Sequence, residues 1–264
     1  MQLPLWLVGL DLVIASAIFM TLWYVMGQYA KRVDLIDAGW ALLLVYLSGL
    51  ALMLHGSPGV VEWVVFGFVA VWGLRLFWHI AARLQASSRE GARYAAYREK
   101  WGSSFAVKSF FRLFMVQALL AVLVTAPVVA VVTRQHELVT WVAAVGFGVW
   151  GLGIVFEAIA DLQLSQFLAR KAGRQPDDIM DKGLWKYSRH PNYFGEIMAW
   201  TGAAIVALSA GQWWGLLGPV VLTIVLVKIS GIPPIEKRYR DNKKYEDYKA
   251  KTSALIPLPP KSVE

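Results

Sequence analysis

The stretch "VTWVAAVGFGVWGLGIVF", residues 139–156, decides the fold, because it runs for eighteen residues without a charged side chain. A helix needs about 20 mostly apolar residues to cross the hydrocarbon core of a bilayer, and apolar residues continue here over roughly 138–160. The glycines in this stretch allow a neighbouring helix to approach closely. The sequence therefore predicts a membrane-spanning helix with a surface suited to close packing.

Other stretches of the same kind occur along the chain, which is 57% hydrophobic and contains 13 tryptophans, a residue that membrane interfaces favour. No strand-rich region is visible. We therefore predict an all-α, polytopic membrane protein with about seven transmembrane helices. Besides 138–160, the expected spans cover roughly residues 4–27, 36–54, 59–80, 109–132, 193–211 and 213–232.

The net charge of +8 is distributed unevenly between the connections. Basic residues gather after the first, third and fifth spans and in the tail. The opposite connections, "HGSPGV", "RQHE" and "SAGQWW", contain one basic residue, Arg134. By the positive-inside rule, the N-terminus is outside and the C-terminus cytoplasmic. The charge is thus mostly a signal of topology, and we expect no nucleic-acid partner.

Several chemistries are disfavoured by what the sequence lacks. It has no cysteine, which excludes disulfides and thiolate catalysis, and its four histidines have no metal-ligand spacing, so no metal site is predicted. Neither G-x-G-x-x-G after a strand nor G-x-x-x-x-G-K-[ST] occurs. A nucleotide, if one binds, therefore binds among helices and loops.

Three cytoplasmic segments carry more than topology requires: "SSREGARYAAYREKWG" (87–102), "ARKAGRQPDDIMDKGLWKYSRHPNYFGE" (169–196) and "EKRYRDNKKYEDYKAKTSALIP" (236–257). Arginine binds phosphates bidentately, and tyrosine can stack on a nucleotide ring while donating a hydrogen bond. We expect these segments to build one pocket for a large phosphorylated ligand. Binding to anionic lipid head groups is the alternative, although it needs only charge.

Polar residues also stand at the boundaries of the apolar spans. Pro191 fits the first turn of a helix, and Asn192 and Glu196, four residues apart, then share one face. An acid about one turn into the membrane must pair or stay protonated. Asp37, Arg75, His79 and Asp161 lie toward the same cytoplasmic side and suggest a wet cavity, although an Asp37–Arg75 ion pair would be a purely structural account.

The stretches "GLWKYSRHPNYFGEIMAWTG" (183–202) and "YEDYKAKTSALIPLPP" (245–260) resemble the steroid 5-alpha-reductase superfamily, in particular its bacterial branch of membrane proteins. The resemblance covers most of the chain. It implies one membrane domain, residues 1–264, in which helices of 1–132 enclose an apolar substrate and 133–264 hold NADPH. The implied reaction reduces a carbon–carbon double bond conjugated to a ketone. We expect a monomer in the bacterial inner membrane, surrounded by lipid, with its cofactor site on the cytoplasmic side.

The resemblance also implies roles for single residues. Glu196 is the acid of the motif. For the substrate oxygen, we expect Asp37 together with His79 to be the polarising groups. From the motif and the three cytoplasmic segments together, the expected cofactor-binding set is Arg83, Arg89, Arg93, Asp161, Arg170, Lys171, Tyr187, Arg189, His190, Asn192, Tyr193, Glu196, Arg240, Asp241, Tyr245 and Tyr248.

The substrate side departs from the steroid reductases. Ile36-Asp37 stands where they have a Gln-Glu pair, and Phe77 stands where they have a tyrosine. The substrate is therefore left open between a steroid, another flat apolar enone and an unsaturated lipid.

Two functions other than a reductase also stay open. An S-adenosylmethionine-dependent methyltransferase of the isoprenylcysteine type shares "RHPNYFG", and a non-catalytic sterol- or lipid-binding protein could keep the fold. The arginines of residues 83–98 favour a dinucleotide.

Overall fold

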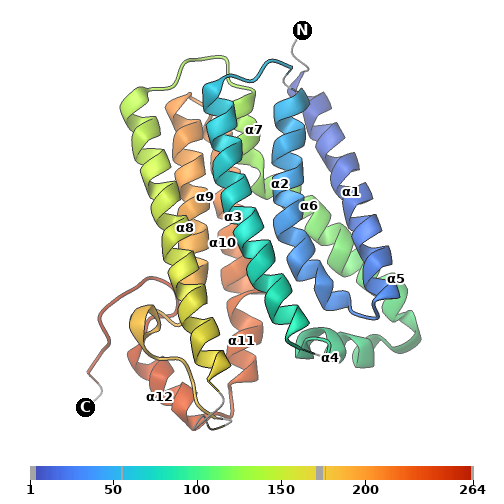
Figure 1. Ribbon diagram of the computed structural model, residues 1–264, viewed down its shortest axis with the longest axis vertical. Helices are drawn as coiled ribbons and strands as arrows, with labels where there is room; N and C mark the ends of the chain where they lie inside the picture. The colour runs from blue at the N-terminus through green and yellow to red at the C-terminus, as the bar shows by residue number, and fades with distance from the viewer. Residues whose placement is uncertain (1–3, 55, 88, 171–174, 176, 263–264) are drawn as a thin grey trace. The chain divides into compact units, whose positions relative to one another are not determined.

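The computed structural model describes residues 4–54, 56–87, 89–170, 175 and 177–262. Every element within these residues is a helix, and the strand-like contact is a single isolated bridge between Ser188 and Ser253 (Figure 1). The all-α prediction is confirmed.

Six helical segments of the described chain are long and apolar enough to cross a membrane, which confirms a polytopic membrane protein. The expected span at 193–211 is also helical, but it is not among the six. The polar side chains of Asn192 and Glu196 near its start lower its mean hydropathy below that of the others. The six are Leu5–Tyr29, Val33–Leu54, Val60–Gln85, Ala92–Val124, Thr140–Ala169 and Trp213–Arg238.

The chain divides into two compact units, and each is described by itself. The first comprises Met1–Ala143 and Ala203–Val221, and the second comprises Ala144–Gly202 and Leu222–Glu264. The long helices α8 (Thr140–Ala169), α9 (Pro191–Ser209) and α10 (Leu217–Ile224) each contribute residues to both units.

The first unit is built on three long helices that run side by side (Figure 1). These are α1 (Leu5–Tyr29), α2 (Ile36–Leu54, after the short helix η1, Val33–Leu35) and α3 (Val60–Gln85). The ring of Trp23 fixes the turn between α1 and α2, because its Nε1 donates to the carbonyl of Leu35 at 2.8 Å. That ring occupies the space where a side chain on Gly39 would stand, with a Cβ only 2.5 Å from Nε1.

A helical run then begins earlier than the expected span of residues 109–132. It comprises α4 (Ala92–Trp101), η2 (Gly102–Ser104), α5 (Phe105–Ser109), the π-helix η3 (Phe110–Met115) and α6 (Val116–Val124). It breaks at Thr125, before α7 (Ala126–Val132), because Pro127 has no N–H to donate to the preceding turn. The short helix η5 (Trp213–Leu216) packs against α7.

The second unit centres on α8 and α9, whose backbones approach closely. A Cβ on Gly153 would lie 2.4 Å from the backbone nitrogen of Ala199, and one on Gly195 would lie 2.6 Å from that of Glu157. The close packing predicted for the glycines of residues 139–156 is thereby confirmed at Gly153. The unit also contains η4 (Gly183–Lys186), the π-helix η6 (Val225–Ile229), α11 (Ile232–Arg238) and α12 (Lys243–Lys251).

Substituting Gly153 by alanine is expected to destabilise the protein by about 1–3 kcal/mol, because the facing atoms belong to the backbone of α9 and the two helices must separate. Gly148→Ala on the same helix is the matched control, since a Cβ there meets nothing within 4 Å. Alanine's helix propensity should leave that variant as stable as the wild type or slightly more stable. Thermal unfolding in detergent measures both, and equal melting temperatures for the two variants would contradict the packing account.

Candidate functional site

The segment that precedes α9 is attached to α8 by specific hydrogen bonds. Gly183 adopts a positive φ of 60°, and a Cβ there would lie 2.6 Å from Oε1 of Gln163. That same oxygen accepts from the backbone N–H of Leu184 at 2.9 Å. Trp185 Nε1 donates to the carbonyl of Ala160 at 3.1 Å. The entry of the chain into α9 is therefore fixed relative to the end of α8 that carries Asp161.

The C-terminal segment holds the same residues from the other side. The Arg189 guanidinium, buried to all but 9%, donates to Glu236 at 2.5 and 3.1 Å and to the carbonyl of Thr252 at 2.6 Å. Its backbone N–H donates to the carbonyl of Ser253 at 2.8 Å. Tyr248 donates its hydroxyl hydrogen to the carbonyl of Trp185. Arg189 is thus committed to holding the tail, a contact that the sequence did not indicate.

One polar pair and one close packing contact join α8 and α9 near the buried acids. Asn192 Nδ2 donates to Asp161 Oδ1 at 3.3 Å, and Gly195 packs against Glu157. Asp161, Glu157 and Glu196 are all buried. Sequence reasoning missed Glu157, although its position four residues before Asp161 places both acids on one helix face and could have revealed it.

Three buried polar atoms of this region lack a well-formed hydrogen bond among the described residues: His190 Nε2, Asn192 Oδ1 and the hydroxyl of Tyr245. His190 Nε2 lies 4.0 Å from Glu236 and the Tyr245 hydroxyl faces Arg189, so Asn192 Oδ1 is the clearest of the three. Buried polar groups are nearly always hydrogen-bonded, so such atoms are candidates for contact with a ligand. His190 is 2% exposed, and its ring stacks on Tyr193 with centroids 5.5 Å apart. Two of the three atoms belong to the R-H-P-N segment, and the third belongs to α12.

Burial lowers the pKa of His190 to about 4, against the weaker opposing attraction of Glu236, and the charge of Arg189 lowers it further. A neutral buried histidine stabilises the fold above its ordinary pKa of 6.5, and that stability is lost as pH falls toward 4. We expect a loss of up to about 3 kcal/mol over this range, which His190→Gln should avoid. Melting temperatures measured from pH 7 to 4.5 check this. Parallel curves for the wild type and the variant would contradict it.

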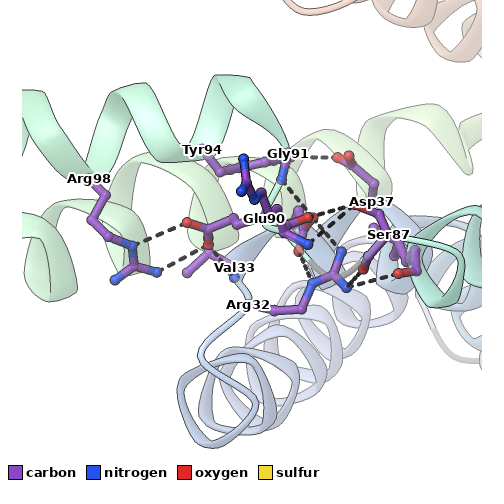
Figure 2. A network of polar contacts seen from close by, with 11 residues as sticks. Arg32, Val33, Asp37, Ser87, Glu90, Gly91, Tyr94 and Arg98 are labelled. Carbon is purple, nitrogen blue, oxygen red and sulfur yellow. Dashed lines mark hydrogen bonds and ion pairs between the residues drawn. The ribbon is translucent and has the colours of Figure 1, made fainter.

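A second polar cluster lies in the first unit and joins the α1–α2 turn to the α3–α4 linker (Figure 2). Arg32 donates to Asp34 at 2.9 Å and to the carbonyls of Leu84 and Ser87 at 2.8 and 2.6 Å. Asp34, which is 2% exposed, also accepts from the N–H of Gly91 at 2.9 Å. Glu90 completes the cluster by accepting from the N–H of Val33 at 2.8 Å and from Arg98 at 3.1 Å.

Asp37 belongs to the same cluster (Figure 2). Its Oδ1 accepts from Arg93 at 3.1 Å and from the hydroxyl of Tyr94 at 2.5 Å. Asp37 therefore forms an ion pair with Arg93, and the Asp37–Arg75 pair suggested from the sequence stays a prediction. Tyr94 was not singled out from the sequence, because it lies 57 residues away in the chain and only the folded linker brings it to Asp37.

The predicted site residues fall into three groups. In the second unit, Asp161, Arg189, His190, Asn192, Tyr193, Glu196, Tyr245 and Tyr248 lie on the α8–α9 pair and the segments bound to it, whereas Tyr187, Arg170, Arg240 and Asp241 are exposed. In the first unit, Asp37 and Arg93 meet, His79 is half-buried on α3, and Arg83 and Arg89 are exposed. Lys171 lies outside the described residues.

Comparison with known proteins supports the resemblance read from these motifs. The chain is similar to 3-oxo-5-alpha-steroid 4-dehydrogenase 1 of Rattus norvegicus, with 32% identity over 115 residues, and to those of Macaca fascicularis (31% over 114) and Homo sapiens (29% over 114). Each match covers 43% of this chain and 40% of the relative. No solved structure matches significantly.

A family model matches a much larger share of the chain. It covers residues 23–252, which include the polar residues of both units described above, the α8–α9 pair and all of α12. The family is described as "Protein of unknown function (DUF1295)". The resemblance to the steroid 5-alpha-reductase superfamily is confirmed by these findings together, and the chain belongs to the DUF1295 family.

Proposed function

We propose that this protein is an NADPH-dependent membrane reductase that acts on a carbon–carbon double bond conjugated to a ketone in an apolar, steroid-like or lipid substrate. The observation that carries the proposal is the buried Oδ1 of Asn192, which has no hydrogen-bond partner among the described residues, while Nδ2 of the same amide donates to Asp161. The similarity to 3-oxo-5-alpha-steroid 4-dehydrogenases supports it for part of the chain.

The residues present fit a nicotinamide nucleotide. Asn192 Oδ1 is a buried acceptor, and the carboxamide of a nicotinamide ring carries N–H donors. His190 Nε2 and the Tyr245 hydroxyl offer further polar atoms for ribose or carboxamide groups. When bound, NADPH supplies the hydride for the reduction. If the reductase proposal fails, the two alternative functions are an S-adenosylmethionine-dependent methyltransferase and a non-catalytic sterol- or lipid-binding protein.

The chain's own residues fix the orientation of these groups. Asp161 accepts from Asn192 Nδ2, so the amide is turned with Oδ1 left for a ligand. Arg189 holds the entry to α9 against the tail, and Tyr193 supports the ring of His190. Arg189 is therefore assigned a positioning role. The assignment of Arg83, Arg89, Arg170 and Lys171 to cofactor phosphates stays a prediction.

We assign to Asp37 and His79 the polarisation of the substrate oxygen. Both residues lie in the first unit, whose helices are proposed to enclose the substrate. The Asp37 side chain is 29% exposed and accepts from Arg93 and Tyr94, so its position is fixed before a substrate arrives. An enone oxygen gains negative charge as the double bond is reduced, and donors held in place around it lower the barrier. Asp37 can donate to that oxygen only in its protonated form. We also propose that the C-terminus is cytoplasmic, as the distribution of basic residues suggests.

Turnover tests the proposal. Purified protein in lipid vesicles, given NADPH and a 3-oxo-4-ene steroid, should oxidise NADPH and yield a product heavier by two hydrogens. Glu196→Gln, which removes a buried charge on the face of Asn192, should lower turnover at least about tenfold. Undiminished NADPH binding and turnover in that variant would remove Glu196 from the scheme. If the protein binds NADPH but reduces no apolar enone, the proposed class of substrate is wrong.

A further inference from the structure

A cleft of about 1000 Å³ opens within the second unit, beside the C-terminal end of α8. One wall is formed by α8 through Gln163, Gln166, Phe167 and Arg170. The other walls come from the 178–186 segment and from α12 with the residues that follow it. Asp161, His190, Asn192 and Tyr245 do not line this cleft, whereas Arg170 and Tyr248 of the predicted cofactor-binding set do.

The charge of the cleft favours an anion. Its lining contains five cations and three carboxylates, and one cation, Lys244, is already bound to Asp177 and Asp178 at 3.0 and 2.6 Å. The remaining cations, Arg170, Lys182, Lys186 and Lys251, outnumber the remaining carboxylates, Asp181 and Asp247. Phe167, Ile179 and Met180 add an apolar part to the same lining.

The cleft lies on the face of α8 opposite Asp161. At about 100° of rotation per residue, its four α8 residues stand about 140–240° around the helix axis from Asp161. An apolar strip of α8 leads to this face from the middle of the helix, through Leu152, Val155, Ile159 and Leu162. These side chains are 43–65% exposed, as expected of a surface that contacts lipid.

We propose that the cleft binds an anionic phospholipid. The headgroup phosphate is bound by Lys182, Lys186 and Lys251, and the acyl chains lie along the strip from Leu152 to Leu162. The end of a membrane-spanning helix stands at the level of the headgroups, where basic clusters attract anionic lipid. An apolar strip that continues into a cationic cleft matches both parts of such a lipid. This inference does not depend on the reductase activity.

The test titrates the detergent-solubilised full chain with short-chain phosphatidylglycerol, and with phosphatidylcholine of equal chain length, and measures bound lipid by native mass spectrometry. Wild-type protein should prefer the anionic lipid. The triple variant Lys182→Gln, Lys186→Gln, Lys251→Gln should lose that preference by about tenfold or more. Lys186→Gln alone should show a smaller loss in the same direction.

A matched control removes the same charge elsewhere: Lys100→Gln, Lys237→Gln, Lys243→Gln, at exposed positions that do not line the cleft. It should keep the preference. If both triple variants lose the preference for the anionic lipid equally, the proposal is wrong, because the overall positive charge of the protein would then explain the binding. ATP is added as a third probe. If it displaces phosphatidylglycerol at lower concentration than the lipid needs to bind, the cleft takes a nucleotide phosphate and the lipid assignment is wrong.

Discussion

Replacing Arg189 by glutamine is expected to lower the free energy of unfolding by about 3–5 kcal/mol, which is the usual cost of removing one partner of a buried ion pair. Arg189 is 9% exposed, and its guanidinium donates to Glu236 and to the carbonyls of Thr252 and Lys249. Glutamine cannot reach all of these acceptors, so Glu236 keeps a poorly compensated charge. The measurement is thermal or denaturant unfolding in detergent micelles.

Two further variants separate this ion pair from a general loss of charge. Arg240→Gln removes an arginine that is 75% exposed and pairs at 3.7 Å with Asp241, which is 92% exposed, and stability should change by less than about 0.5 kcal/mol. Adding Glu236→Gln to Arg189→Gln should recover part of the lost stability, because it removes a carboxylate that is left with the more distant Lys249, at 3.8 Å, in place of Arg189. An Arg189→Gln protein as stable as Arg240→Gln would show that the tail is held by other contacts.

Replacing Asn192 by alanine is expected to weaken NADPH binding by about ten- to a hundredfold. The proposed contact is to Oδ1, a buried acceptor without a partner among the described residues, and the cost of leaving a buried donor of the ligand unpaired is about 1–3 kcal/mol. The variant also removes the donor to Asp161 Oδ1, so the carboxylate is no longer fixed. Fluorescence titration of NADPH against the solubilised protein measures the effect.

Gln175→Ala is the control for this prediction, since it removes an exposed side-chain amide in the same unit. Its affinity for NADPH should equal that of the wild type. A folded Asn192→Ala protein with wild-type affinity would place the cofactor away from the first turn of α9, and Asp161 and His190 would lose their assigned roles with it.

Much of the fold could be predicted from local patterns. Pro191 was expected in the first turn of a helix, and α9 begins at that residue. The glycines of residues 139–156 indicated close packing, which Gly153 provides. The span count was harder to predict, because α9 combines polar residues at one end with apolar residues at the other. The break at Thr125 depends on one proline inside an otherwise continuous apolar run. Orientation and the monomeric state stay predictions.

The site was less accessible to sequence reasoning, because its contacts join residues far apart in the chain. Asp37 and Asn192 could be selected as polar residues at helix starts. That Arg93 and Tyr94 would reach Asp37 depends on how the α3–α4 linker folds back onto the α1–α2 turn. Arg189 was read as a cofactor contact because arginines often bind phosphates. Its partners on the C-terminal segment lie 47–63 residues away and carry no local signal.

The most direct test of the reductase account is the binding of NADPH to the purified, detergent-solubilised protein, with NADH and S-adenosylmethionine measured beside it. A ligand that binds the folded state raises its melting temperature, so thermal shift and fluorescence can be compared. The account predicts saturable binding of NADPH and no binding of S-adenosylmethionine. Binding of S-adenosylmethionine without NADPH would indicate a methyltransferase. Binding of neither, by protein shown to be folded, would contradict the proposed cofactor site.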